Sequence, residues 1–218
     1  MDFELSPVEA RIIGALMEKE RTTPGNYPLS LNALTNACNQ KSNRNRVIDI
    51  SEDLIAGALD GLGFHRKLTK RQLSEDSRVP KYRHDITDVF SLSPQEYAVI
   101  CVLLLRGPQT LGEIRGRTER LYNFENLETV EQTLTELANR EDPLVKQLPR
   151  QPGRKEARYG HLLSGEIEVE EIDIVEPAVL EIRAENERVD KLELEVQSLR
   201  EEQQALKQQF AEFKQQFE

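Results

Sequence analysis

Positively charged side chains gather in two stretches of the sequence, each of which is expected to contain a β-hairpin. Residues 41–83 hold ten basic and six acidic side chains, and residues 144–158 hold five basic and one acidic. Clustered Lys and Arg can bind nucleic-acid phosphates, because they neutralise the backbone charge and release counterions. The candidate phosphate contacts are Lys41, Arg44, Arg46, Arg66, Lys67, Arg78, Lys81, Arg83, Arg154, Lys155 and Arg158. The alternative interpretation is that basic residues merely protect exposed hairpin edges from pairing with other strands.

The helices expected before these hairpins carry the opposite charge. One begins Ser51-Glu52-Asp53 and has no Lys or Arg before Arg66, and the other begins Leu127-Glu128 and has none before Arg140. In a helix-turn-helix, such a helix enters the major groove with its first turns on the bases. Carboxylates there would face phosphates, each repelling by about 1 kcal/mol across water. Contact with DNA through the hairpins, or with protein through the helices, therefore fits better than groove reading.

Nothing in the residue spacing predicts catalysis or metal binding. Cys38 and Cys101 fall on expected inward helix faces, His65 is isolated, and His84 and His161 are expected at strand ends as structural or surface residues. The sequence has no glycine-rich phosphate loop and no nucleophile elbow, and no carboxylate pair stands in an apolar setting. We expect neither an enzyme nor a bound cofactor.

Composition places the chain among non-membrane proteins of a reducing compartment. The longest apolar run, residues 97–105, is far shorter than the roughly 20 residues of a membrane span, and the first residues do not resemble a secretory signal. Two cysteines suit a reducing cytoplasm. The net charge of −10 comes entirely from residues 165–218, whereas residues 1–164 carry 23 basic and 23 acidic side chains. The overall acidity therefore does not exclude an anionic partner for residues 1–164.

Residues 1–164 contain an internal repeat. The helix start Leu-Ser-Pro-Val-Glu at 5–9 recurs as Leu-Ser-Pro-Gln-Glu at 92–96, each with a Ser N-cap, a Pro at the first helical position and a capping-box Glu. Shorter helices are expected from Ser30 and from Thr110. A third helix follows in each copy, with inward residues Leu54, Ile55, Ala58 and Leu62 in the first and Leu127, Val130, Leu134 and Leu137 in the second. Hairpins over residues 64–84 and 144–163 complete the two copies.

This order of elements predicts a fold that is mainly α-helical with small β-hairpins. Three short helices and a hairpin are the layout of a winged helix-turn-helix domain, and we assign one to residues 1–88 and another to residues 89–164. A domain of about 80 residues has a marginal core of its own. We therefore expect the two to pack together as one rigid unit.

The C-terminal residues differ in pattern from the rest. Residues 165–178 are expected to form an acidic linker, and residues 179–218 a coiled-coil helix with apolar residues at most a and d positions of a heptad. The predicted dimer contacts are Ile182, Val189, Leu192, Val196, Leu199, Leu206, Phe210 and Phe213. A homodimer is the leading interpretation, and an amphipathic helix folded back on the winged helices is the alternative.

Three long runs resemble the YceH-like family of uncharacterised bacterial proteins. They are TTP at 22–24 followed by YPLSLNALTNACNQKSNR at 27–44, then SRVPKYRH at 77–84, and LLLRGPQT at 103–110. The resemblance covers about residues 3–163 and the expected C-terminal helix. It implies a tandem winged-helix fold in a bacterial cytoplasm, and it implies no activity.

Two functions remain open from the sequence. The first is a DNA-binding regulator, dimerised by its C-terminal helix, with the hairpins and residues 41–46 on double-stranded DNA. The second is a non-enzymatic scaffold whose winged helices and acidic helix faces bind another protein. They differ in salt response, because phosphate contacts weaken steeply with salt and an apolar protein interface does not.

Overall fold

The computed structural model describes residues 4–45, 47–73, 79–150 and 156–166. The candidate phosphate contacts Arg46, Arg78, Arg154 and Lys155 lie outside the described residues, as does the expected coiled coil with all of its dimer contacts. Within the described residues the chain is mainly helical with small antiparallel sheets. No described helix is both long enough and apolar enough to span a bilayer.

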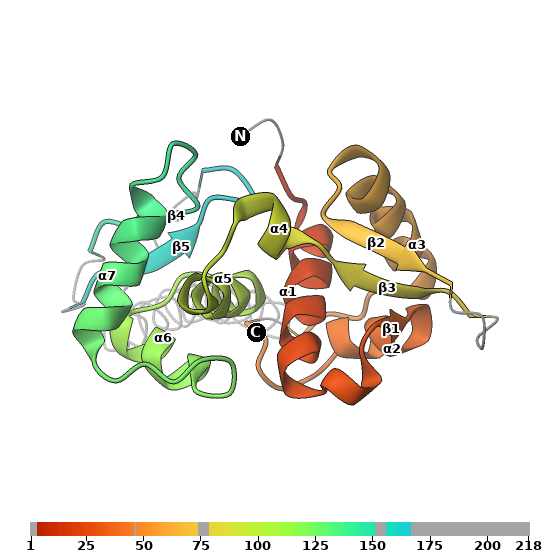
Figure 1. The fold of residues 1–218 in the computed structure, drawn as a ribbon, viewed down its shortest axis with the longest axis horizontal. Helices are drawn as coiled ribbons and strands as arrows, with labels where there is room; N and C mark the ends of the chain where they lie inside the picture. Colours follow the sequence, from red (N-terminus) through yellow and green to blue (C-terminus); the bar gives the residue numbers. More distant parts are fainter. Residues whose placement is uncertain (1–3, 46, 74–78, 151–155, 167–218) are drawn as a thin grey trace, which may run out of the picture. The chain divides into compact units, whose positions relative to one another are not determined.

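Two sets of elements follow each other in the same order, helix, helix, helix and hairpin (Figure 1). The elements of the first half are α1 (Pro7–Thr22), β1 (Leu29–Ser30), α2 (Leu31–Cys38), α3 (Glu52–Asp60), β2 (Thr69–Gln72) and β3 (Lys81–His84). A short helix, α4 (Ile86–Phe90), leads to the second half. The elements of the second half are α5 (Pro94–Arg106), α6 (Leu111–Thr118), α7 (Leu127–Ala138), β4 (Val145–Gln147) and β5 (Tyr159–His161).

The helix starts expected from capping signals are confirmed. The amide of Ser6 donates to Glu9 Oε2 at 2.8 Å, while the amide of Glu9 donates to Ser6 Oγ at 3.3 Å. Ser93 and Glu96 repeat this reciprocal capping box at the start of α5. Each box satisfies two amide groups that the first turn of a helix leaves without partners.

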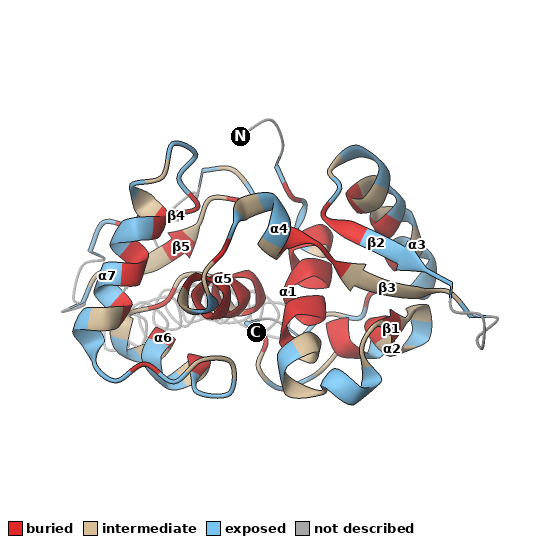
Figure 2. Ribbon diagram, in the orientation of Figure 1, coloured by how far each residue is buried: buried red, intermediate tan, exposed pale blue. Residues whose placement is uncertain are grey.

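Both halves contribute to one hydrophobic core, at whose centre α1 packs against α5 (Figure 2). Every residue of α1 from Ala10 to Met17 is buried, as is every residue of α5 from Ala98 to Leu105. The helices approach closely at Gly14, where an added Cβ would lie 2.9 Å from side-chain carbons of Leu105. Helices α2 and α3 pack on α1, and α6 and α7 pack on α5. The assignment of separate domains at residues 1–88 and 89–164 stays a prediction, because residues 1–170 form a single compact unit.

Each half also has a small antiparallel sheet. In the first half the strand order is β1-β3-β2, so that β2 is an edge strand, with Arg71 opposite Tyr82 and Lys70 opposite Arg83. In the second half β4 pairs with β5, and an isolated bridge joins Gln109 to Tyr159. The hairpins expected at these places are therefore present, whereas β1 was not expected from the sequence.

Two residues expected to point inward are exposed instead. Leu54 of α3 is 53% exposed and Leu127 of α7 is 44% exposed. The buried stripe of the first-half helix consists of Ile55, Leu59 and Leu62, and Leu54 lies about 100° around the helix from it. Leu127 is the first residue of α7, one turn before the buried residues of that helix.

Candidate interaction surface

The exposed face of α3 is acidic and partly apolar. Ser51 caps this helix by accepting a hydrogen bond from the amide of Leu54 at 3.3 Å. Its exposed residues are Glu52, Asp53, Leu54, Gly57 and Asp60. Since no Lys or Arg lies between Val47 and His65, this helix offers phosphate only carboxylates.

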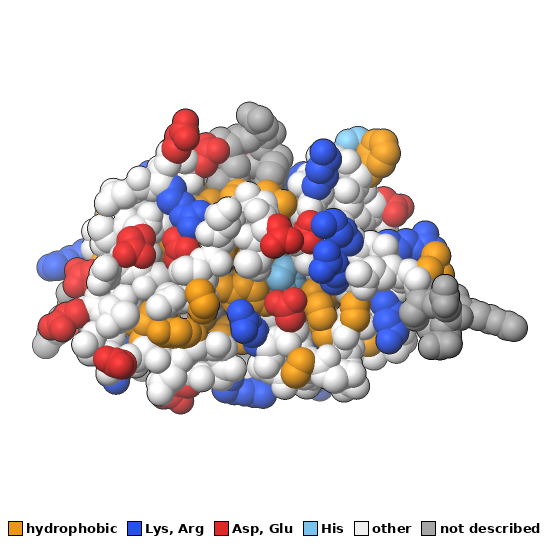
Figure 3. Space-filling model, in the orientation of Figure 1, with side chains coloured by type: hydrophobic (Ala, Val, Ile, Leu, Met, Phe, Trp, Pro, Cys, Tyr) orange, Lys and Arg blue, Asp and Glu red, His pale blue; other side chains and the backbone are white. Residues whose placement is uncertain are grey.

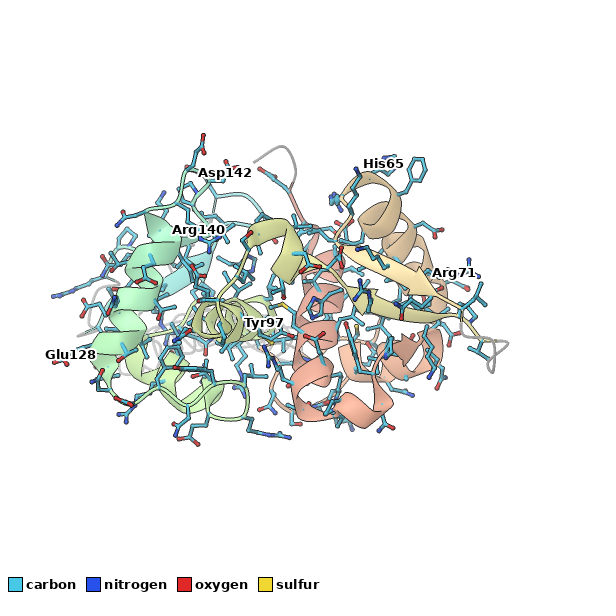
Figure 4. All side chains as sticks on the ribbon, viewed as in Figure 1. His65, Arg71, Tyr97, Glu128, Arg140 and Asp142 are labelled. Atoms are coloured by element: carbon cyan, nitrogen blue, oxygen red, sulfur yellow. The ribbon has the colours of Figure 1, made fainter. Side chains whose placement is uncertain are left out.

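After α3 the chain makes a π-helical turn, Gly61–His65, that projects an aromatic ring into solvent. Leu62 is fully buried and its carbonyl accepts from the amide of Leu68 at 2.9 Å, which anchors the turn. Phe64 is 83% exposed, and its ring lies 5.1 Å from that of His65 in an edge-to-face arrangement. Figure 4 labels His65 at this turn. An exposed aromatic ring offers a large apolar contact area to a binding partner.

A cavity of about 630 Å³ lies between this turn and the hairpin, and we call it the groove. Its lining residues are Leu59, Asp60, Gly63, Phe64, Thr69, Lys70, Arg71, Gln72 and Tyr82. All four residues of β2 contribute to the lining, and β2 has a hydrogen-bonded neighbour on one side only. The groove therefore combines apolar side chains with a strand edge that can accept an added strand.

The candidate phosphate contacts of the sequence analysis separate into paired and unpaired cations. Lys41, Lys67 and Lys81 form no ion pair with any described residue, and neither does Arg71. On the face shown in Figure 3, Lys and Arg side chains gather over the hairpin of β2 and β3. The structure thus places Arg71 and Lys81 on the strands of one hairpin, with Lys67 two residues before β2, and leaves Lys41 near the end of α2.

Arg44 is not a surface cation, contrary to the expectation for the loop before α3. Its side chain is fully buried, with Nη2 2.8 Å from Glu18 Oε2 and 2.9 Å from the carbonyl oxygen of Ala37. Asn43, which precedes it, has a left-handed backbone with φ of 60°. Because Arg44 stabilises the junction of α1 and α2 from inside, it is removed from the candidate phosphate contacts.

The remaining basic candidates are held by carboxylates of their own half. Arg66 pairs with Glu9 and also donates to the carbonyl oxygen of Glu4 at 2.9 Å. Arg83 lies 3.2 Å from Asp85, which also pairs with Lys70. In the second half, Arg158 lies 3.3 Å from Glu113. These pairs reduce the positive charge that both hairpins present.

The second half has no exposed cation on its third helix either. Glu128, Glu131 and Glu136 are exposed on α7, and Figure 4 labels Glu128 at its outer end. Arg140 follows the helix and turns inward, with Nη2 2.7 Å from Glu96 and Nη1 2.5 Å from the carbonyl oxygen of Phe90. Arg66 and Arg140 therefore play matching parts, since each pairs with the capping-box glutamate of its own half.

A buried polar cluster joins the first hairpin to α1 and α5. His84 Nε2 lies 3.0 Å from Glu20 Oε2 and 3.1 Å from the hydroxyl of Tyr97, which is 2.8 Å from the same carboxylate. The hydrogen bond from His84 holds the pKa of Glu20 below its usual value, whereas burial raises the pKa of Tyr97 far above its own. These hydrogen bonds tie β3, α1 and α5 to one another, which gives the cluster a structural role.

The histidine at the matching place in the second half has a different environment. Burial lowers the pKa of His161 to about 4, and no described carboxylate pairs with it, although its Nδ1, like that of His84, has no hydrogen-bond partner among the described residues. Among the described residues, no group of three or more His, Cys, Asp or Glu side chains could hold a metal ion.

Sequence reasoning did not single out Phe64 or the pairing roles of Arg66 and Arg140. A signal for Phe64 was available, because it lies off the stripe of Ile55, Leu59 and Leu62 and follows a Gly-Leu-Gly run. The pairing of the two arginines had no local signal, since their partners lie 57 and 44 residues away.

Comparison with known proteins identifies a family over most of the chain. The model of a family described as "Protein of unknown function, DUF480" matches residues 5–154. A UPF0502 protein of Geobacter sulfurreducens is 51% identical over 221 residues, with all of both chains covered. A UPF0502 protein of Pelobacter propionicus is also 51% identical over the whole of both chains, and one of Vibrio atlanticus is 48% identical over 93% of this chain and 94% of its own. The family resemblance noted in the sequence is thereby confirmed.

Proposed function

The chain belongs to the DUF480 family, also called UPF0502, and we propose that it is a non-enzymatic protein-binding module that takes an extended polypeptide segment into the groove. The observation that carries this proposal is Phe64, 83% exposed at the rim of a cavity whose other wall is the edge strand β2. An apolar anchor beside free backbone hydrogen-bonding groups is the combination used in β-strand addition.

The charges of the surface support a protein segment over a nucleic acid. Lys70 is paired with Asp85, and Asp60 lines the groove opposite the unpaired Arg71. The lining is therefore close to neutral, and the neighbouring face of α3 is acidic. A polyanion would gain little here, whereas backbone pairing with β2 and burial of Phe64 need no net charge.

We further propose that the two halves are tandem winged-helix domains and that the chain forms a homodimer through residues 179–218. A dimer would present two grooves, so that a partner with two copies of the segment would bind more tightly than one with a single copy.

Selection from a displayed library of random peptides tests the proposal on the full-length chain. We expect enrichment of segments with apolar residues at alternate positions, because these suit a strand added to β2. Phe64→Ala should abolish the enrichment. Leu127→Ala, which removes an exposed apolar residue from the second half, is the matched control and should leave it intact. Equal enrichment of such peptides by Phe64→Ala and by the unaltered chain would contradict the proposal.

DNA binding is the second candidate, and it is favoured by three cations at the first hairpin that form no ion pair with any described residue. Lys67, Arg71 and Lys81 could contact phosphates without any help from α3. Fluorescence anisotropy with a random duplex pool separates the two functions. Binding that falls steeply between low and physiological salt, and that is lost when these three residues become Ala, would establish DNA as the ligand. The protein-binding proposal expects no such binding.

A further inference from the structure

A second cavity lies where α1, α5 and α6 meet, and it shares no residue with the groove. Its volume is about 210 Å³, and Val102 and Leu105 of α5 form an apolar part of its wall. Three guanidinium groups line it, from Arg106 at the end of α5 and from Arg117 and Arg120 at the end of α6. We call it the arginine cavity.

Two of these three arginines form no ion pair with any described residue. Arg106 donates to an amide oxygen, Oδ1 of Asn43, and Arg120 is exposed. Arg117 lies 3.3 Å from Glu113 and donates to Gln109 Oε1 at 2.8 Å. The described residues therefore compensate these cations only in part.

The carboxylates at the cavity do not remove this excess. Glu18 lines the cavity, but Oε2 of its carboxylate is held by the buried Arg44 at 2.8 Å. Glu119 also lines it and, like Arg120, is exposed to solvent, where both charges are screened. Burial, and next the charge of Arg117, hold the pKa of Arg106 below its usual value, as expected for a cation that faces other cations.

We propose that the arginine cavity binds a small oxyanion, of the size of phosphate or of a short dicarboxylate. Guanidinium groups offer paired N–H donors that match both phosphate and carboxylate oxygens. The volume is below the roughly 300–1,000 Å³ of sites for larger ligands, so the anion must be small. An anion there would give Arg106 and Arg120 the negative charge that the described residues do not supply.

Such a ligand would connect the two halves of the structure. The cavity takes Glu18 and Thr22 from the first half and its three arginines from the second. Binding to the folded chain alone stabilises it by mass action, so that the anion should raise the melting temperature.

Titration of the full-length chain with inorganic phosphate and, separately, with malonate tests this proposal, with NaCl keeping ionic strength constant. We expect a saturable rise in melting temperature with at least one anion, and a matching heat of binding by calorimetry. The anion that saturates at the lower concentration identifies the preferred chemistry.

Two charge-removing variants keep the test decisive. Arg106→Gln should weaken binding by about 10- to 100-fold, as expected for loss of a hydrogen bond between charged groups. Arg120→Gln should weaken it as well, and its exposed position leaves the fold intact if Arg106→Gln does not fold. Arg150→Gln, on an exposed loop away from the cavity, is the control and should bind as the unaltered chain does. Absence of saturation with both anions, or unchanged affinity in both arginine variants, would overturn the proposal.

Discussion

The two halves of the structure share their scaffold and differ at the end of the third helix. In the second half α7 runs regularly to Ala138, and Arg140 turns directly back to Glu96. In the first half α3 ends at Asp60, and the π-helical turn puts Phe64 into solvent before Arg66 pairs with Glu9. In both halves an arginine after the third helix thus pairs with the capping-box glutamate. Among the described residues, the π-helical turn Gly61–His65 has no counterpart in the second half, and this turn forms the groove beside β2.

This difference shows how two halves with the same order of elements can share internal contacts and differ at their surfaces. The capping boxes and the arginine pairs are matched in both halves, and the two capped helices, α1 and α5, pack against each other. The exposed aromatic residue and the edge strand of the groove occur where that matched scaffold is interrupted. The proposed peptide groove therefore belongs to the first half alone, whereas the features that both halves share are expected to serve stability.

The largest predicted effect contrasts the loops that precede the third helices. Arg44→Ala should lower the free energy of unfolding by about 3–5 kcal/mol, because it leaves the carboxylate of Glu18 without its buried partner. At the other loop, Arg115 of α6 donates to the carbonyl oxygens of Phe124 and Glu125 and pairs with no described carboxylate, so Arg115→Ala should cost about 1 kcal/mol. Urea unfolding measures both, and equal effects would contradict the asymmetry.

The next effect concerns the two histidines at matching strand ends. His161 has a pKa of about 4 when folded against about 6.5 when unfolded, so the unfolded chain binds more protons between these values. Stability should therefore be lost as the pH falls from 6.5 to 4, by up to about 3 kcal/mol. His161→Gln should flatten this part of the unfolding-against-pH curve. A slope unchanged in His161→Gln would assign the acid sensitivity to other groups.

A smaller effect tests whether the arginine pairs are equivalent. Arg66→Ala and Arg140→Ala should each lower the free energy of unfolding by about 1–2 kcal/mol, because both side chains are partly exposed and both hold a capping-box glutamate. Lys67→Ala, an exposed neighbour of Arg66, is the control and should change stability by less than about 0.5 kcal/mol. A difference of several kcal/mol between the two arginine variants would break the proposed correspondence of the halves.

The smallest effect on stability is the most informative about function. Phe64→Ala should change the free energy of unfolding by no more than about 0.5 kcal/mol, since its ring is already in water. Leu62→Ala, two residues earlier and fully buried, should cost about 2–5 kcal/mol. Thermal unfolding of the two variants checks whether Phe64 is free of a structural role.

Local features of the fold could be predicted from the sequence, and long-range ones could not. Ser6, Ser93 and Thr110 marked helix starts correctly, because capping depends on residues three apart. Leu54 was assigned to the wrong side, since spacing alone does not say which of two adjacent stripes meets the core, whereas Leu127 is exposed because it is the first residue of its helix.

The candidate surface could be predicted only in part. The acidic character of the third helices was plain in the sequence and holds on their exposed faces. Which cations form ion pairs could not be predicted, because Arg44 pairs with Glu18 and Arg66 with Glu9, and these partners lie 26 and 57 positions apart. Only the folded chain shows which positive charges remain available.

Hydrogen exchange at β2 tests the central claim most directly. The full-length chain would be measured alone and with the peptide pool enriched by selection, following each amide by NMR. With the peptides bound, we expect slower hydrogen exchange for the amides of β2 that point away from β3, and changed chemical shifts at Phe64. The exchange rates of the β4 amides should stay the same. Unaltered exchange in β2 would contradict a strand-adding groove, as would protection that appears on the second half instead.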